Sequence, residues 1–141
     1  MPAFFQDLDK FGAANAVSYY SAPNTIQRIS YSELQSKCQT FAKQIKSQRS
    51  LVLLLTENTP ETLIAYLSCL QNQHPVMLLD ADISESRLTD IKKCYQPNCL
   101  IREGNVEHFS TDKHALEPDL AVLLSTSGST GSPKQVALSY E

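Results

Sequence analysis

The chain has 141 residues, of which 42% are hydrophobic and 19% are charged, and it carries a formal net charge of −3. These values fit one globular domain with a real core, and an acidic chain without a Lys/Arg cluster gives no reason to expect a nucleic acid partner. No apolar run, including 51–55, is long enough to cross a membrane, and polar residues at 6–10 interrupt any signal-peptide core, so we expect a cytoplasmic protein.

The first part of the chain predicts a short helix, a β-hairpin and a longer helix. Phe4, Phe5, Leu8 and Phe11 recur on one helical face, which Gly12 ends. The β-prone runs 16–20 and 26–31 flank a turn sequence at 21–24 and predict a hairpin. Ser30 and Glu33 match a capping box. The apolar residues that follow predict a helix to about Lys46, with a buried face made of Leu34, Cys38, Phe41, Ala42 and Ile45.

The middle of the chain predicts alternating strands and helices. The wholly apolar segment 51–55 is typical of a strand covered on both faces. Thr59, Pro60 and Glu61 supply a cap, a first-turn proline and a first-turn acid for the next helix, whereas Ser84 caps a later one. Segments 75–79 and 98–101 predict two further strands. The buried faces of the two helices are expected to carry Leu63, Ile64, Leu67 and Leu70 in the first, and Leu88 and Ile91 in the second.

The end of the chain predicts a buried strand at the edge where ligands bind. Gly104 and Asn105 turn the chain before a short edge strand at 106–109, and a polar connector covers 112–118. The apolar run 119–124 then predicts another strand. The whole order implies an α/β fold, a parallel sheet flanked by helices on both faces with an N-terminal β-hairpin. Ligands of such sheets bind at the carboxyl ends of the strands.

The cysteines and histidines are too scattered to predict a metal site. Their positions are Cys38, Cys69, Cys94 and Cys99, and His74, His108 and His114. The cysteines form no C-x-x-C pair and the histidines share no i, i+4 spacing. Helical spacing places Cys38 and Cys94 on buried faces, and Cys99 falls in a strand. We therefore expect buried free thiols rather than disulfides or a zinc site.

A segment rich in hydroxyl groups follows the strand at 119–124. It reads Ser-Thr-Ser-Gly-Ser-Thr-Gly-Ser-Pro-Lys from Ser125 to Lys134. Gly128 and Gly131 let the backbone approach a ligand closely, and the hydroxyl and N–H groups offer donors to phosphate oxygens. Lys134 adds a positive charge. This composition predicts a loop that holds a polyphosphate, although a Ser/Gly-rich surface linker is the alternative.

The loop differs from the Walker phosphate loop, which needs G-x-x-x-x-G-K-[ST] and then a helix. The apolar residues after Lys134 stand at alternate positions, Val136 and Leu138, which is the period of a strand. We therefore expect a strand, a loop and a second strand. Because no helix dipole would then stabilise the phosphate, its binding must depend on side-chain hydroxyls, loop amides and Lys134.

Residues 123–134 resemble the signature of the AMP-forming adenylating enzymes, the superfamily of acyl-CoA synthetases and peptide-synthetase adenylation domains. They fit hydrophobic-x-x-[ST]-[ST]-G-[ST]-[ST]-G-x-P-K at every position, and Gln135 stands where the family usually has Gly. Segments 29–34 and 84–88 are similar to its T-Y-x-E-L and P-E-E-R-L motifs. Segment 70–80 is similar to L-x-A-G-A-x-x-V-P-L-D, but Asn-Gln-His replaces the usual Ala-Gly, which leaves the local turn geometry open.

This resemblance implies a ligase that uses ATP and Mg²⁺ to activate a carboxylic acid as an acyl-adenylate. Such enzymes usually pass the acyl group to a thiol, which is CoA or a carrier protein. The resemblance assigns phosphate binding to Thr126, Ser127, Gly128, Ser129, Thr130, Gly131 and Lys134. It assigns no catalytic residue and no metal ligand to this chain. For Thr126 and Ser127, hydrogen bonding within the loop itself is the alternative.

The family pattern also implies that residues 1–141 are the N-terminal portion of an AMP-binding domain that ends just after its phosphate-binding loop. The adenine and acyl pockets, the acids that bind ribose and magnesium, and the C-terminal domain lie downstream in the family. We therefore expect this portion to be inactive alone, with its acid substrate and acceptor open. An uncovered strand at 136–138 would favour a homodimer. A free-standing nucleotide- or anion-binding module and a non-catalytic interaction domain are the other two interpretations.

Overall fold

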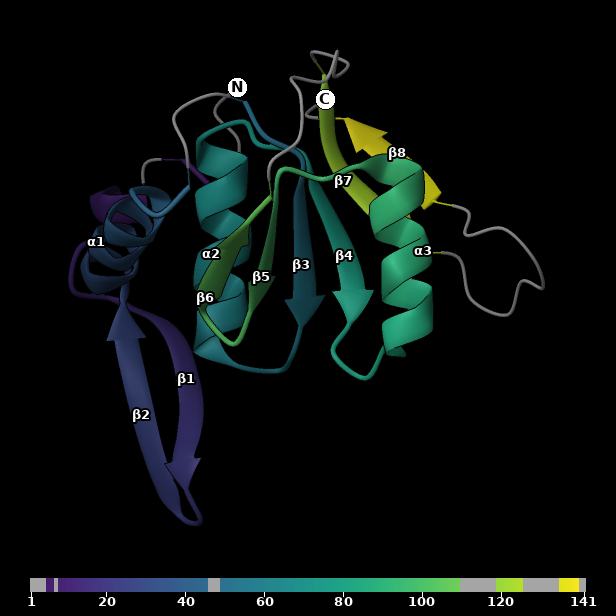
Figure 1. The fold of residues 1–141 in the computed structure, drawn as a ribbon. Helices are drawn as coiled ribbons and strands as arrows, with labels where there is room; N and C mark the ends of the chain where they lie inside the picture. The colour runs from purple at the N-terminus through teal and green to yellow at the C-terminus, as the bar shows by residue number, and fades with distance from the viewer. Residues whose placement is uncertain (1–4, 7, 46–48, 110–118, 126–134, 140–141) are drawn as a thin grey trace.

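The computed structural model describes residues 5–6, 8–45, 49–109, 119–125 and 135–139. Its strands form a two-stranded sheet, β1-β2, and a six-stranded sheet in the order β6-β5-β3-β4-β7-β8 (Figure 1). The elements are η1 (Leu8–Phe11), β1 (Asn15–Ala22), β2 (Thr25–Ser30), α1 (Tyr31–Ala42), β3 (Val52–Thr56), α2 (Pro60–Gln71), β4 (Val76–Asp80), α3 (Glu85–Tyr95), β5 (Cys99–Arg102), β6 (Asn105–His108), β7 (Leu120–Ser125) and β8 (Gln135–Ser139).

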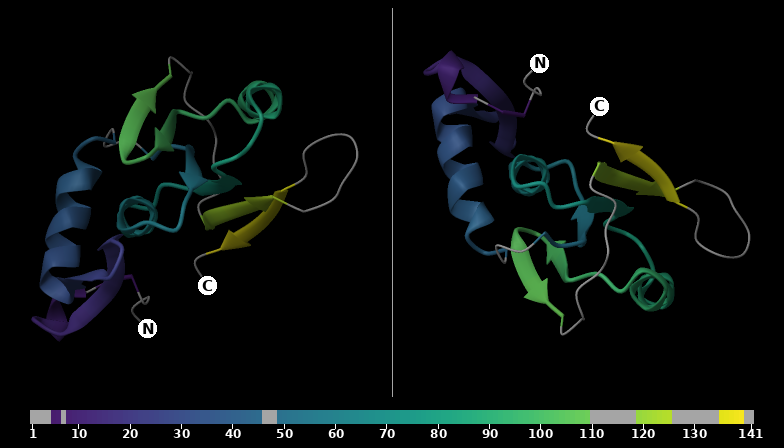
Figure 2. Two further views of the ribbon diagram at one scale, coloured as in Figure 1. Left: turned by 90° about the horizontal axis from the view of Figure 1, so that it is seen from below. Right: turned by 90° about the horizontal axis from the view of Figure 1, so that it is seen from above.

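The large sheet confirms the predicted α/β fold. Its inner strands β5, β3, β4 and β7 are parallel, whereas the edge strands β6 and β8 run antiparallel to their neighbours. Helix α2 packs on one face with α1 against it, and α3 lies on the other face (Figure 2). No helix within the described ranges is long and apolar enough to span a membrane.

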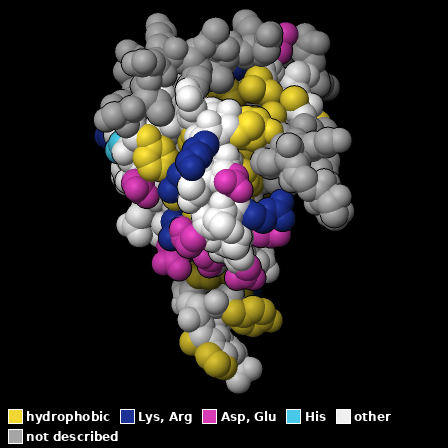
Figure 3. Space-filling model, turned by 45° about the vertical axis from the view of Figure 1, so that its right-hand side comes forward, with side chains coloured by type: hydrophobic (Ala, Val, Ile, Leu, Met, Phe, Trp, Pro, Cys, Tyr) yellow, Lys and Arg dark blue, Asp and Glu magenta, His cyan; other side chains and the backbone are white. Residues whose placement is uncertain are grey.

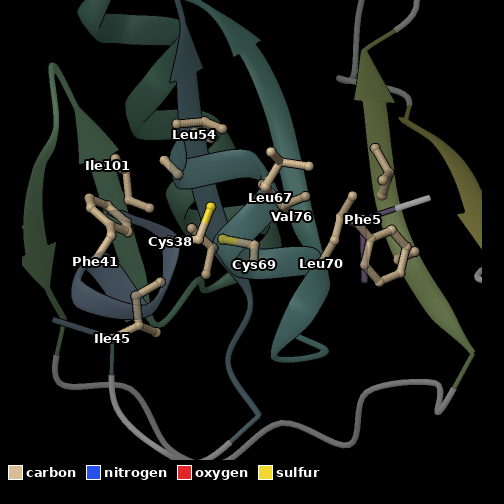
Figure 4. Packing of buried hydrophobic residues seen from close by; sticks show 14 of the residues in the cluster. Phe5, Cys38, Phe41, Ile45, Leu54, Leu67, Cys69, Leu70, Val76 and Ile101 are labelled. Carbon is tan, nitrogen blue, oxygen red and sulfur yellow. The ribbon is translucent and has the colours of Figure 1, made fainter. Parts of the chain in front are cut away.

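Strand β3 explains why the sequence of 51–55 is wholly apolar. Val52 and Leu54 point into the larger core cluster, on the α2 face, while Leu53 and Leu55 point into the smaller cluster with α3. Each of these side chains is buried. Figure 4 shows side chains from α1, α2, β3, β4 and β5 meeting in the larger cluster. Since side chains alternate along a strand, only a strand covered on both faces buries every position.

The caps that the sequence predicts are present. In the capping box of α1, the backbone N–H of Glu33 donates to Ser30 Oγ over 3.1 Å, and the Glu33 carboxylate accepts from the Ser30 N–H. Thr59 caps α2 with Pro60 at its first position, and Ser84 caps α3. These local signals fix where each helix begins.

Helix α1 ends at Ala42, so the prediction of a helix to Lys46 was wrong. After Ala42 the chain forms tighter turns, in which the N–H groups of Gln44 and Ile45 donate to carbonyls three residues back. Such bonds end the α-helix and still turn the chain toward the core. Ile45 is therefore buried as its spacing predicted, although it is not in the helix.

A short helix before Gly12 is present, whereas the buried face predicted for α2 is confirmed only in part. The segment before Gly12 is a four-residue 3₁₀ helix, in which Leu8 is buried but Phe11 is 53% exposed and lies against the Tyr31 ring. Phe5 is buried, while Phe4 lies outside the described residues. In α2, Leu67 and Leu70 are buried as expected, but Leu63 and Ile64 are only partly buried.

Cysteine burial was predicted correctly except at Cys94. Cys38, Cys69 and Cys99 are buried free thiols, but Cys94 is exposed because α3 turns Leu88 and Ile91 toward the sheet and Cys94 to one side. Burial raises the pKa of the Cys38 and Cys69 thiols. These thiols are therefore neutral and packed as small apolar groups.

The turn after β5 differs by one residue from the predicted one. Arg102 pairs with Asn105, so Glu103 and Gly104 form the two-residue loop and Asn105 begins the edge strand β6. Both loop residues have positive φ, 52° and 78°, as a tight hairpin turn requires. The predicted edge strand is therefore confirmed, whereas the connector predicted at 112–118 lies outside the described residues.

The turn after α2 keeps a left-handed backbone although the sequence has no glycine there. Gln73 has φ 58°, and the N–H of His74 donates to Cys69 O over 2.9 Å, which closes the helix end. A residue other than glycine meets steric repulsion in this conformation. Residues 72–74, which differ from the family motif, therefore form a turn in which the backbone of Gln73 is strained.

Replacing Gln73 with glycine should relieve that strain. We expect Gln73→Gly to raise the free energy of unfolding by about 0.5–1 kcal/mol, because relief of the left-handed strain exceeds the extra backbone entropy of glycine. Urea unfolding measures the change. The control Gln39→Gly, at an exposed site inside α1, should lower stability by about 0.5 kcal/mol. If both substitutions lowered the free energy of unfolding, the result would contradict strain at Gln73.

A network of hydrogen bonds lies at the edge of the sheet where the parallel strands begin. Arg49 donates from Nε to Gln73 O and from Nη2 to Leu120 O, each over 2.9 Å, which ties the turn before β4 to β7. The Ser50 N–H donates to His74 Nδ1 over 3.0 Å. Because Nδ1 accepts this bond, the buried His74 imidazole is neutral, and burial together with the Arg49 charge lowers its pKa.

His74 should make stability fall at acid pH. Its folded pKa lies below the ordinary 6.5, so the unfolded chain takes up the proton first as the pH drops. The free energy of unfolding is therefore expected to decrease below about pH 6.5 and to stop responding to this group beneath its folded pKa. His74→Gln keeps an acceptor but should flatten this part of the profile. The exposed His108→Gln is the control, and equal slopes in both variants would disprove the assignment.

Candidate functional site

The carboxyl ends of the parallel strands meet at one edge of the sheet, the lower edge in Figure 1. Thr56 ends β3 and is in register with Asp80, which ends β4. Ser125 ends β7 and pairs with Gln135, the first residue of β8. The segment that the sequence marks for phosphate binding is thus bounded by two paired residues at the edge where α/β sheets bind ligands.

The predicted phosphate-binding residues themselves lie outside the described residues. They are Thr126, Ser127, Gly128, Ser129, Thr130, Gly131 and Lys134. Their flanks confirm the predicted pair of strands, since β7 and β8 are antiparallel neighbours. The residues after Lys134 form β8 rather than a helix, so this site differs from a Walker loop.

A pocket of about 380 Å³ opens at the same edge, between the hairpin and the sheet. No pattern in the sequence predicts this pocket, because its walls come from four separate elements. Apolar and aromatic side chains form these walls: Val17 and Tyr19 of β1, Leu54 of β3, Leu63 and Tyr66 of α2, and Leu78 of β4. Burial raises the pKa of the Tyr66 phenol, which is therefore a neutral hydroxyl.

Hydroxyl groups on the rim of this pocket already have partners. Thr59 Oγ1 accepts from the Thr62 N–H over 3.3 Å, and Thr62 Oγ1 accepts from the Glu57 N–H over 3.1 Å. Thr56 Oγ1 donates to Leu79 O over 3.1 Å. These bonds fix the turn between β3 and α2. The rim hydroxyls therefore help to shape the pocket.

Acidic side chains surround the strand ends. Glu57, Asp80 and Asp82 are exposed there, and the exposed Glu85 lies 3.6 Å from Arg102. Figure 3 shows acidic and basic side chains on the body just above the protruding hairpin. Within the described ranges, no group of three or more His, Cys, Asp or Glu side chains is placed to hold a metal. The exposed carboxylates at this edge disfavour a phosphate ligand unless cations offset their charge.

We compared the chain with models of known protein families. The family described as AMP-binding enzyme matches residues 4–117. The chain belongs to this family. The match includes the capping box of α1 and the strands β3 to β6, but it ends before β7. Family membership is thus shown by residues that lie upstream of the signature from which the resemblance was first inferred. No curated protein sequence matches the chain.

Solved structures show the same fold over nearly the whole chain. The N-terminal subdomain of Klebsiella oxytoca NpsA, in complex with 3-hydroxyanthranilyl-AMSN, has a TM-score of 0.72 at 20% identity, and the match covers 99% of this chain and 41% of that one. Bacillus subtilis MenE, an O-succinylbenzoate coenzyme A synthetase in complex with AMP, has a TM-score of 0.73 at 17% identity. That match covers 99% of this chain and 42% of the MenE chain. IdnL1 has a TM-score of 0.71 at 15% identity, and the match covers 97% of this chain and 33% of the IdnL1 chain. The chain therefore spans about two-fifths of the first of these relatives.

Proposed function

We propose that residues 1–141 act as the N-terminal portion of an AMP-forming acid ligase, and that they supply its ATP phosphate-binding loop. Membership of the AMP-binding family carries this proposal. The position of segment 126–134 between the paired ends of β7 and β8 supports it, because that edge is where α/β sheets bind ligands. The protein would activate a carboxylic acid as an acyl-adenylate and pass the acyl group to CoA or a carrier protein.

The chemistry of this step suits the residues of the loop. A carboxylate oxygen attacks the α-phosphorus of ATP, and negative charge then develops on the departing pyrophosphate. Donors and cations at the β- and γ-phosphates stabilise that charge. The hydroxyls of Thr126, Ser127, Ser129 and Thr130 and the ammonium of Lys134 would supply them, with Gly128 and Gly131 allowing close approach.

Mg²⁺ would reach the site with ATP. Magnesium is usually held by one or two carboxylates together with substrate phosphates rather than by a protein cage. Such a cation would offset the exposed carboxylates near Asp80, which otherwise repel a polyphosphate. We further propose that the protein works in the cytoplasm and that the chain can form a homodimer through β8, where Leu138 is 44% exposed on an edge strand.

Lys134→Ala should weaken binding of ATP and pyrophosphate. Loss of one charge-assisted hydrogen bond is expected to raise Kd about five- to ten-fold at low salt, and less at high salt, where the charge is screened. Isothermal titration at two salt concentrations measures the change. Lys93→Ala, which removes an exposed lysine of α3, is the matched control. Equal effects of the two substitutions would refute the role of Lys134.

The chain alone should not exchange pyrophosphate into ATP with any carboxylic acid. Phosphate binding without a group that positions the acid cannot bring the reacting atoms together. The assay uses radiolabelled pyrophosphate and a panel of aliphatic, aryl and amino acids. Exchange above background would show that the active site is complete within 141 residues and would overturn the assignment as an N-terminal portion.

A further inference from the structure

Strand β7, which leads to segment 126–134, is joined to the parallel part of the sheet over a short length. Among the described residues it pairs with β4 at three positions, from Val76 opposite Val122 to Leu78 opposite Leu124, whereas β3 and β4 pair at five. On its other side β7 pairs with β8, which is an edge strand. The short ladder to β4 therefore aligns both β7 and β8 with the ends of β3 and β4.

The apolar pattern of β7 does not by itself select the observed register. A shift of one residue would move its side chains to the wrong core cluster, because side chains alternate along a strand. A shift of two residues keeps every side chain on its face and would place 120–122, which are also apolar, opposite 76–78. Since a strand rises by about 3.3 Å per residue, that shift would move Ser125 by about 7 Å relative to Asp80.

Arg49 supplies a second link between β4 and β7, at their amino-terminal ends. Its Nε donates to Gln73 O, three residues before β4, and its Nη2 donates to the carbonyl of Leu120, the first residue of β7, each over 2.9 Å. Both donors belong to one planar guanidinium group, so they hold the two carbonyls at a fixed separation. In the shifted register Leu120 O would be displaced by about 7 Å, and this bond would be lost.

The backbone that carries Arg49 is itself anchored to two other strands. The N–H of Ser50 donates to His74 Nδ1 over 3.0 Å, in the turn before β4. The N–H of Leu51 donates over 2.8 Å to Oδ1 of Asn98, the residue that precedes β5. The guanidinium therefore extends from a segment that is bonded toward both neighbours of β3. Its bond to β7 relates that strand to the rest of the parallel sheet.

Arg49 acts at the edge of the sheet opposite to the candidate site. It binds the first residue of β7, and Ser125 ends this strand five residues later, at a distance of about 17 Å along the strand. The guanidinium thus lies too far from the carboxyl ends of the strands to touch a phosphate there. Any effect of Arg49 on phosphate binding must pass through β7, which would make it a positioning residue.

We propose that Arg49 positions the phosphate-binding loop by fixing the register of β7 against β4, so that the strand end from which segment 126–134 continues stays aligned with the ends of β3 and β4. The inference rests on the proposed function, which assigns phosphate binding to that segment. Molecules in a shifted register do not bind phosphate productively. The apparent Kd therefore rises in inverse proportion to the aligned fraction.

Arg49→Met tests the inference in the 141-residue chain, because methionine keeps an unbranched side chain but donates no hydrogen bond. We expect nuclear Overhauser effects between 76–78 and 122–124 to lose intensity, while those between 52–56 and 76–80 stay unchanged. Isothermal titration at a temperature where the protein is folded should give a Kd for pyrophosphate about five-fold higher, which corresponds to an aligned fraction of about one fifth. Arg49→Lys keeps the charge without the planar pair of donors and should give an intermediate Kd.

Two control variants separate positioning from other effects of the substitution. Cys38→Ala creates a cavity at a buried site of α1, so it should lower the unfolding temperature but leave the Overhauser effects and the Kd unchanged. Lys93→Met removes one exposed positive charge from α3 and should also leave both unchanged. A role of Arg49 in stability or in net charge alone would make Arg49→Met resemble one of these controls.

The remaining outcomes each decide the question. Unchanged Overhauser effects in Arg49→Met would show that β7 keeps its register without the arginine and would overturn the inference. A lost register with an unchanged Kd, in a chain where Lys134→Ala does weaken binding, would also overturn it. Absence of pyrophosphate binding in the unsubstituted chain would remove the proposed function and with it the role of Arg49 in phosphate binding. The Overhauser effects would still show whether the arginine sets the register.

Discussion

Strand β3 is hydrogen-bonded to a neighbour on each edge and is buried on both faces. Its backbone is bonded to β4 on one side and β5 on the other, and its side chains divide between two core clusters. A shift of one residue would move every leucine of β3 to the wrong cluster. The register is therefore fixed, and with it the alignment of Thr56, Asp80 and Ser125 at one edge.

That alignment creates an electrostatic problem at the candidate site. The described residues of this edge include several exposed acids, and Arg102 already lies near Glu85. Hydroxyls on the rim are bonded within the turn that starts α2. The proposed phosphate binding thus depends on Lys134, on the hydroxyls and amides of the loop and on the metal that accompanies ATP. This dependence explains why a single lysine is expected to matter so much for affinity.

The sequence predicted features that neighbouring residues determine. The caps at Ser30, Thr59 and Ser84 need only three or four residues to form, and they were found where predicted. The strand after Lys134 followed from the alternation of Val136 and Leu138. The loop between the strands stays a prediction, because its residues lie outside the described ranges.

Features set by distant residues were not predictable in this way. Helical spacing cannot show whether Cys94 meets the sheet, since that depends on how α3 is rotated over β3 and β4. The end of α1 at Ala42 and the pocket beside Tyr19 depend likewise on how separate elements pack. The polar network at Arg49 joins residues up to 71 positions apart, and no local pattern marks it.

A polar network holds the turn at 73 and 74, although residue 73 is not glycine. Glycine would adopt the left-handed turn without strain, whereas Gln73 is held there at φ 58°. The Gln73 carbonyl accepts from Arg49, and His74 Nδ1 accepts from the Ser50 N–H, a bond that an alanine side chain cannot form. Since the same arginine also binds Leu120 O, these bonds connect the strained turn to β7. The network thus offsets the strain of the turn and helps to hold the strand that leads to the candidate site.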